Sequence, residues 1–207
     1  MHSAGDHEAK LDAIAELIGA GHAAEAEAEA AALLREAPAD AEALRLRAIA
    51  LLRLGRIAEA REALLAALDS APGSIDVLCN LGSVELARGD VQAAIAALER
   101  AFARAPSHPA VWVGLGNARR ANGDLAGARD AYVSATHAQS NHAGAWLNLA
   151  SVELALGNST KAERDVRHAL TLAPGHPEGL LLLGHVLAAQ RRFAEAQGAY
   201  EAGARSA

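Results

Sequence analysis

A spacing of 34 residues runs through this chain and limits its fold more than any other sequence feature. Glycines recur at that interval, and they are Gly21, Gly55, Gly89, Gly123 and Gly157. Alanines recur at the same interval without a substitute, and they are Ala26, Ala60, Ala94, Ala128, Ala162 and Ala196. A fixed period of this length is typical of repeat arrays, in which each unit packs mainly against its neighbours. The 207 residues therefore predict about six stacked units.

Each unit has the pattern of two amphipathic helices separated by the glycine. Apolar residues are spaced by three and four positions, as on the buried face of a helix. The glycine stands where the first helix must end, because glycine readily adopts the positive φ that closes a helix. First helices are expected near residues 41–54, 75–88, 109–122, 143–156 and 177–190. Second helices are expected near residues 57–71, 91–105, 125–138, 159–173 and 193–206.

Other residues in each unit are suited to begin or end these helices. Asp90, Asp124 and Asn158 directly follow a glycine and are expected to cap the second helices by accepting from free N–H groups. Arg191 takes the place of the sixth glycine. Proline cannot continue a helix, and units end at Pro38, Pro72, Pro106 and Pro174.

Two positions in each unit are restricted to small residues. One is the alanine of the second helix, and the other, on the first helices, holds Ala48, Gly82, Gly116, Ala150 and Gly184. Hydrophobic residues make up 52% of the chain but aromatic residues only 3%, and most of the hydrophobic residues are alanine. We therefore expect a core that depends on close helix approach, where added methylene groups cost about 1–3 kcal/mol.

These residues together resemble the tetratricopeptide repeat (TPR) family. Trp112 and Trp146 are each followed by Leu-Gly or Leu-Ala three residues later, and then by the recurring glycine and alanine. The resemblance implies an all-α fold, a right-handed α-solenoid (superhelix) of stacked antiparallel helix pairs. We expect a disordered N-terminus over residues 1–6, followed by a single array over residues 7–207. Its repeats would be 7–40, 41–74, 75–108, 109–142, 143–176 and 177–207.

The first unit departs most from the family pattern. Lys10 stands where later units have Leu or Trp, whereas Leu17 and Gly21 keep the pattern. We interpret this unit as an N-terminal cap whose outer face meets water, as the ends of repeat arrays require.

Charge and hydropathy argue against two classes of partner. Nineteen basic and 25 acidic residues give a net charge of -6, which repels a phosphate backbone, so nucleic acid is not an expected partner. No apolar run approaches the about 20 residues of a membrane span, and the N-terminus does not resemble a signal peptide. We predict no membrane partner and a cytoplasmic location. The single cysteine, Cys79, cannot form an internal disulfide, which suits a reducing compartment.

The resemblance also implies a binding site, a concave groove lined by the first helices that holds a peptide or partner segment. Asn80, Asn117 and Asn148 are the main candidates, because an amide can donate to and accept from any peptide backbone. They are similar to the asparagine ladder in the repeats of O-linked N-acetylglucosamine transferase, although solvated or locally capping side chains would also account for them. Other expected groove residues are Val113, Leu147, Leu181, Arg45 and Arg120. A carboxylate clamp is not expected, since only Arg45 and Asn80 fit its pattern.

No catalytic or metal-binding set is predicted, and the chain is not expected to be an enzyme or to bind a cofactor. His108, His142 and His176 recur every 34 residues, but equivalent positions in stacked units are too far apart to share one ion, so we place them in the loops before first helices. Glu85 and Glu153 lie two units apart, and edge packing or ion pairing accounts for them better than acid–base chemistry.

The sequence leaves three functional hypotheses open. The first is a protein–protein interaction scaffold. The alternative is the substrate-docking TPR domain of a larger bacterial enzyme such as a sulfotransferase, glycosyltransferase or hydroxylase. The third is self-association through the C-terminal repeat, where Leu187, Phe193 and Tyr200 are expected to be partly uncovered.

Overall fold

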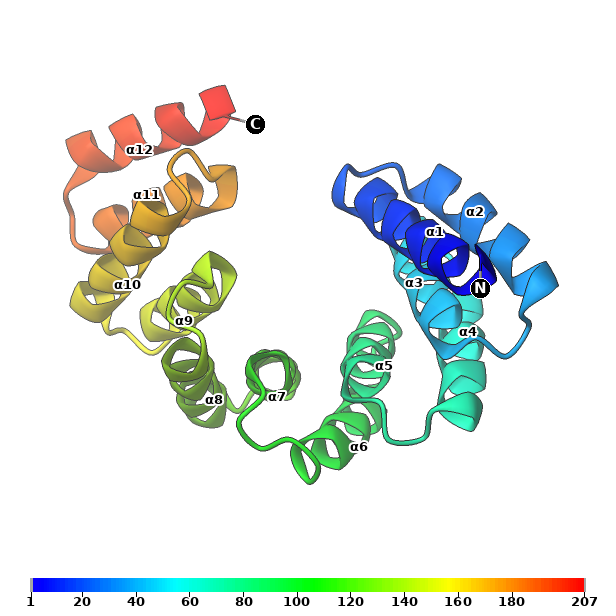
Figure 1. Ribbon diagram of the computed structural model, residues 1–207. Coiled ribbons are helices and arrows are strands. Elements are labelled where there is room, and N and C mark those ends of the chain that lie inside the picture. Colours follow the sequence, from blue (N-terminus) through cyan, green and yellow to red (C-terminus); the bar gives the residue numbers. More distant parts are fainter. Residues whose placement is uncertain (1, 207) are drawn as a thin grey trace. The chain divides into compact units, whose positions relative to one another are not determined.

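The computed structural model describes the backbone of residues 2–206 and the side chains of residues 5–206. Within this part of the chain all regular structure is α-helical, which confirms the predicted all-α solenoid class (Figure 1). The helices are α1 (His2–Gly19), α2 (Ala23–Glu36), α3 (Ala41–Arg53), α4 (Ile57–Ser70), α5 (Ile75–Ala87), α6 (Val91–Phe102), α7 (Pro109–Ala121), α8 (Leu125–Ala138), α9 (Ala143–Ala155), α10 (Ser159–Leu172), α11 (Pro177–Ala189) and α12 (Phe193–Ser206). Every helix predicted after residue 40 is present.

The chain divides into two compact units, one up to Pro106 and the other from Ser107 onward. The N-terminal unit contains α1 to α6 and the C-terminal unit contains α7 to α12, so each consists of three helix pairs. Within a unit, the second helix of one pair packs against the first helix of the next, as α2 does on α3 and α10 does on α11. Among the described residues, none of the helices is both long and apolar enough to cross a membrane.

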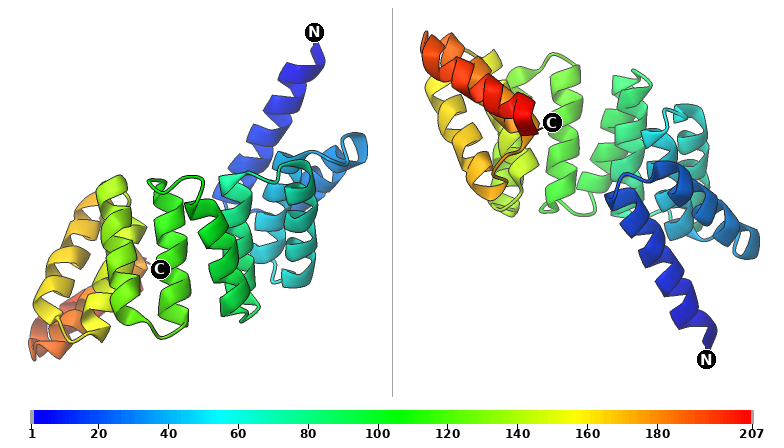
Figure 2. Two further views of the ribbon diagram at one scale, coloured as in Figure 1. Left: turned by 90° about the horizontal axis from the view of Figure 1, so that it is seen from below. Right: turned by 90° about the horizontal axis from the view of Figure 1, so that it is seen from above.

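The N-terminus differs from the expectation of disorder over residues 1–6. α1 begins at His2 and is 18 residues long, so its first turns extend beyond the other helices of the unit (Figure 2). Two side-chain contacts support this extension. Lys10 Nζ lies 3.8 Å from Asp6 one turn earlier, and His7 Nε2 lies 2.5 Å from Asp40 Oδ2 at the start of α3. Met1 lies outside the described residues.

Helix ends follow the predicted local signals, with one exception. The five recurring glycines have φ between 73° and 86°, and Arg191, in the sixth position, has φ 62°. Asp90 and Asp124 cap their helices by accepting from Ala93 and Gly127. The prediction for Asn158 is wrong, because its Nδ2 donates instead to Glu153 Oε2 at 2.7 Å.

Both small-residue positions lie at close helix contacts. All six recurring alanines are buried, with at most 3% of their surface exposed. On the first helices, a Cβ added at Gly82 would lie 2.8 Å from Leu98, and one added at Gly116 would lie 2.4 Å from Tyr132. The glycines thus admit larger side chains from the second helix of the same pair.

Charged side chains join successive pairs within each unit. In the N-terminal unit, Arg47 of α3 pairs with Glu27 of α2 at 2.9 Å, and Arg61 of α4 pairs with Glu85 of α5 at 2.8 Å. Glu85 is only 2% exposed, so its expected ion pairing is confirmed. Glu85 also pairs with Arg88 at 2.5 Å, so two arginines hold this buried carboxylate.

The C-terminal pair is better covered than the sequence suggests. Leu187 is only 2% exposed, so the expectation that it is partly uncovered is wrong. Val166 and Ala199 lie in the same cluster and cover it. Phe193, at the start of α12, does remain 66% exposed.

Candidate functional site

The predicted site residues all lie on first helices. We call the side of each unit formed by its first helices the first-helix surface, which comprises α1, α3 and α5 in one unit and α7, α9 and α11 in the other. Arg45 on α3 and Asn80 on α5 belong to the N-terminal unit. The C-terminal unit holds the other predicted residues, Val113, Asn117, Arg120, Leu147, Asn148 and Leu181.

Asn80 has an unsatisfied donor next to a small cavity. Its Nδ2 is buried and has no hydrogen-bond partner among the described residues. The cavity measures about 20 Å³ and is also lined by Ile49, Leu52 and Leu64. An unpaired buried donor costs about 1–3 kcal/mol, so an acceptor that reached this amide would be favoured.

Arg45 is less available for a ligand than the sequence suggests. Its Nη2 lies 2.5 Å from Glu42 Oε1, and this hydrogen-bonded carboxylate raises the pKa of Arg45 above its ordinary value. The positive charge of the guanidinium is thus already partly balanced by Glu42, a carboxylate on the same helix. A ligand carboxylate would have to compete with Glu42.

Asn117 is held by a buried tyrosine. The hydroxyl of Tyr132 donates to Asn117 Oδ1 at 2.7 Å, which fixes the amide and leaves its Nδ2 as the donor for another group. Burial raises the pKa of Tyr132, and the nearby charge of Arg120 opposes that rise. The tyrosine therefore stays protonated at neutral pH and keeps its donor role.

Asn148 and the predicted apolar residues form the rest of the C-terminal unit's surface. Asn148 is half-buried and has no side-chain hydrogen-bond partner among the described residues. Leu147 reaches α11, where a Cβ at Gly179 would lie 3.3 Å from it. Leu181 is 41% exposed and leans toward Gly203 of α12. Its apolar surface is partly open to a ligand.

The contact between Tyr132 and Asn117 was missed at the level of sequence. The sequence does contain a signal for this contact. Tyr200 and His185 stand two repeats after Tyr132 and Asn117, at the same positions in the last helix pair. There the Tyr200 hydroxyl and His185 Nδ1 are 3.0 Å apart, and the two rings meet edge to face. In both pairs the tyrosine holds a polar residue on the first-helix surface.

The recurring histidines stand before first helices, as predicted, and two of them act as caps. Nδ1 of His142 accepts from Ala145 N at 2.9 Å, and Nδ1 of His176 accepts from Gly179 N at 3.3 Å. In His108 the same atom is buried without a partner. In the part of the chain that the structure describes, no group of three His, Cys, Asp or Glu side chains is placed to hold a metal ion.

Cys79 does not provide a reactive thiol. Burial raises its pKa to about 11, and the negative charge of Asp76 adds to the rise. Because the thiolate is the nucleophilic form, this cysteine is essentially unreactive at neutral pH. It serves as a small buried residue of α5.

Comparisons with known proteins agree with this architecture. A tetratricopeptide repeat model matches residues 11–75, 79–141 and 117–177. The solved structure of PilW, a type IV pilus biogenesis factor, is 21% identical with a TM-score of 0.79, over 96% of this chain and 91% of that chain. A thermophilic TPR protein of Thermus thermophilus is 21% identical with a TM-score of 0.78, over 92% and 98% of the two chains.

A third solved structure, that of MamA, is 19% identical with a TM-score of 0.64, over 77% of this chain and 93% of that chain. No curated protein sequence matches the chain significantly. At these identities the solved structures support the fold alone.

Proposed function

The chain belongs to the tetratricopeptide repeat family, and from this premise we propose that it is a protein–protein interaction scaffold. The first-helix surface of each unit binds an extended segment of another protein. Asparagine side chains hold the backbone of that segment, and Val113, Leu147 and Leu181 contact its side chains. The proposal assigns no catalytic step to the chain.

The unpaired Nδ2 of Asn80 is the observation that carries this proposal. A peptide carbonyl is a suitable acceptor, because every residue of an extended segment presents one regardless of its side chain. Asn148, which has the same position in its repeat as Asn80, also lacks a side-chain partner among the described residues. Neither amide gives up a hydrogen bond within the protein on binding, and Asn80 must turn its buried Nδ2 outward to reach a ligand.

Asn117 supports the proposal in a different way. Tyr132 already occupies its Oδ1, so the amide is oriented before a ligand arrives and loses little side-chain freedom on binding. Arg120, which is exposed on the same helix, can approach a carbonyl or carboxylate of the segment. We expect Asn117 to act mainly as a donor.

The test compares capture of partner proteins by the wild-type chain and by the triple variant Asn80→Ala, Asn117→Ala and Asn148→Ala. Each neutral hydrogen bond contributes about 0.5–1.5 kcal/mol, so single changes should weaken binding roughly 2- to 13-fold and the triple change much more. Binding should also depend weakly on salt, since neutral amides dominate the contact.

A matched control replaces an asparagine outside the first-helix surfaces. Asn141 is exposed in the loop before α9, and Asn141→Ala should retain every partner that the wild type retains. Equal retention by the triple variant would move the binding site to the second helices or the loops and would reject the proposal.

A further inference from the structure

The N-terminal unit has an open hollow of about 730 Å³ between α1 and α2, away from the predicted groove residues. Its floor is formed by Ile14 and Leu33, which are 1% and 3% exposed. Three alanines, Ala13, Ala20 and Ala32, form its apolar walls. We call this site the α1–α2 hollow.

The hollow exists because two residues of α1 are unlike their counterparts in later repeats. Lys10 stands where other first helices have Leu or Trp, and Ala13 stands where Leu is most frequent. Lys10 turns to the edge, where its Nζ donates to Glu36 Oε2 at 3.2 Å. The space that two bulky side chains would fill is left open.

Equivalent faces elsewhere in the same unit are covered by a helix. α2 packs on the next pair through Glu27, which contacts Arg47, and Arg47 has the repeat position of Ala13. α4 packs on α5 in the same way through Arg61 and Glu85. The shape of the α1–α2 hollow is therefore that of a helix-binding face.

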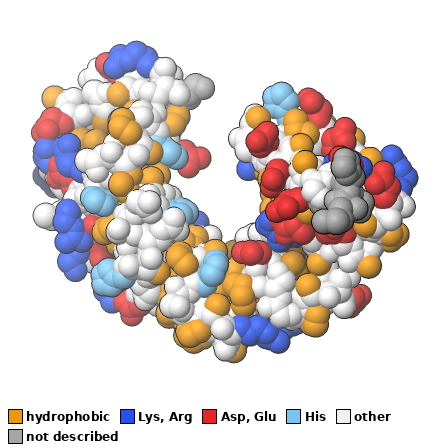
Figure 3. Space-filling view, in the orientation of Figure 1, with side chains coloured by type: hydrophobic (Ala, Val, Ile, Leu, Met, Phe, Trp, Pro, Cys, Tyr) orange, Lys and Arg blue, Asp and Glu red, His pale blue; other side chains and the backbone are white. Residues whose placement is uncertain are grey.

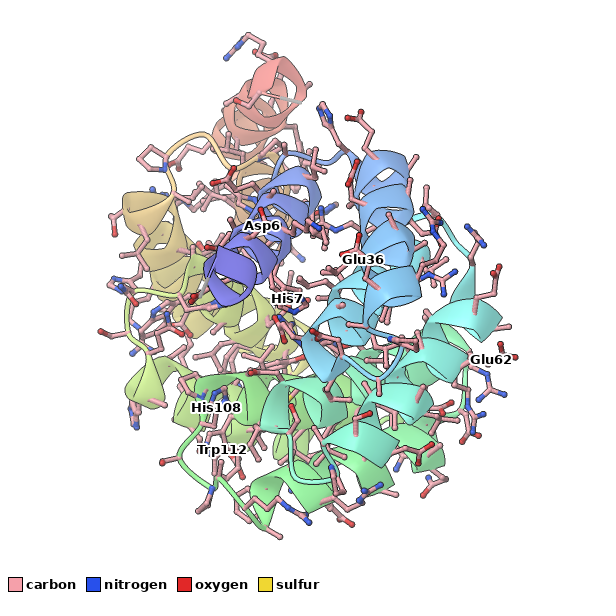
Figure 4. All side chains as sticks on the ribbon, turned by 45° about the vertical axis from the view of Figure 1, so that its right-hand side comes forward. Asp6, His7, Glu36, Glu62, His108 and Trp112 are labelled. Carbon is pink, nitrogen blue, oxygen red and sulfur yellow. The ribbon has the colours of Figure 1, made fainter. Side chains whose placement is uncertain are left out.

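The rim of the hollow is acidic. Glu16, Glu29 and Glu36 line it together with two basic side chains, Lys10, which is paired with Glu36, and His22, which is paired with Glu25. The pKa of Lys10 is raised mainly by its hydrogen bond with Glu36 and also by the charge of Glu29, and Glu16 is exposed beside them. Figure 3 shows acidic side chains gathered over α1 and α2, and Figure 4 shows Asp6 on α1 and Glu36 at the end of α2.

We propose that the α1–α2 hollow binds one cationic amphipathic helix of a partner protein. The wall of α1 from Lys10 to Ala20 is about 15 Å long, which corresponds to about three helical turns. The bound helix presents Ala- and Leu-sized side chains to the floor, and its Lys or Arg residues lie beside Glu16 and Glu29. This surface differs from the first-helix surface of the proposed function and takes a helix rather than an extended segment.

The test uses the full chain and two fluorescein-labelled 14-residue peptides as probes. One is an amphipathic helix of Leu, Ala and Lys, and the other has Glu in place of each Lys with the same apolar face. We expect the Lys peptide to bind at least about 10-fold more tightly than the Glu peptide, because the rim repels the latter. Its affinity should fall as salt is raised.

Variants then locate the bound peptide. Glu16→Gln combined with Glu29→Gln should weaken binding of the Lys peptide by about 2- to 5-fold for each charge removed. Ala13→Trp, which fills the hollow from an exposed position, should abolish binding. The matched control is Glu62→Gln, since Glu62 is exposed on α4 away from the hollow and should leave affinity unchanged (Figure 4).

Each other outcome rejects the proposal. Equal binding of the two peptides would remove the charge argument, and unchanged affinity in the double Gln variant would place the peptide elsewhere. If the chain alone self-associates in sedimentation and Ala13→Trp abolishes this, a second copy is the occupant. Circular dichroism checks that Ala13→Trp is folded, and the double Gln variant decides the question if it is not.

Discussion

A Cβ atom at Gly116 would lie 2.4 Å from Cε1 of Tyr132, closer than real side chains approach one another. Gly184 has the same relationship to Tyr200, also at 2.4 Å. In these two repeats the first helix has no side chain at this position, and a tyrosine ring of the second helix occupies the space. The hydroxyl of that ring then contacts the polar residue that directly follows the glycine on the first helix, which is Asn117 or His185.

We expect Gly116→Ala to destabilise the chain by about 1–3 kcal/mol, because Tyr132 is fully buried and has no room to move. Gly198→Ala is the matched control. Gly198 is also within a helix but has no atom near its Cβ position, so this change should stabilise by roughly 0.5–1 kcal/mol. Chemical denaturation measures both, and destabilisation of similar size in the two variants would contradict the packing argument.

Replacing Arg191 by glycine is expected to stabilise the chain, whereas Gly116→Ala is expected to destabilise it. Arg191 adopts φ 62° at a position where five other repeats have glycine, and a non-glycine residue in this region costs about 1–2 kcal/mol. A glycine at this position would remove that cost. Glycine also gives the unfolded chain more conformational freedom, which offsets part of the gain, so we expect Arg191→Gly to stabilise by roughly 0.5–1 kcal/mol. Arg191→Ala keeps the strained backbone and should not stabilise. Thermal unfolding of the three proteins gives the comparison.

Asp165 should make stability depend on pH. Burial raises its pKa above the ordinary value, Arg164 opposes the rise, and the nearby Glu153 adds to it. A carboxyl whose pKa is raised by folding stabilises the folded state fully below its unfolded pKa. This stabilisation is lost as pH rises through the folded pKa.

We therefore expect the stability of Asp165→Asn, relative to the wild type, to increase as pH rises from about 4 toward neutrality. Urea denaturation at several pH values measures the difference between the two proteins. A difference that stays constant over this range would show that Asp165 has the same pKa in the folded and unfolded chains.

The C-terminal repeat is expected to self-associate through Phe193. This side chain is 66% exposed and Leu181 is 41% exposed, whereas Leu187 is covered. Large exposed apolar side chains favour association. We expect Phe193→Ser to reduce association in sedimentation velocity over a wide concentration range. A wild-type chain that stays monomeric at the highest concentration would contradict this prediction.

Local signals explain how much of the fold could be predicted. A glycine with positive φ, an aspartate before a helix and an apolar residue every three or four positions each act over one or two turns. The 34-residue period repeats these signals, so the helix boundaries inferred for one unit apply to the others. The helices after residue 40 were predictable for this reason.

Side-chain contacts that depend on how the helices pack decided the remainder. Asn158 and Asp124 occupy the same position in their repeats, yet Asp124 caps its helix and Asn158 donates to Glu153. The sequence alone does not indicate a partner for Asn117, whereas the structure shows that the Tyr132 hydroxyl donates to it. Capping acts within a few residues and can be recognised in the sequence, whereas the partner of a buried polar side chain depends on which groups a neighbouring helix brings within about 3 Å. The open space left by Lys10 and Ala13 likewise appears only when α2 is packed beside α1.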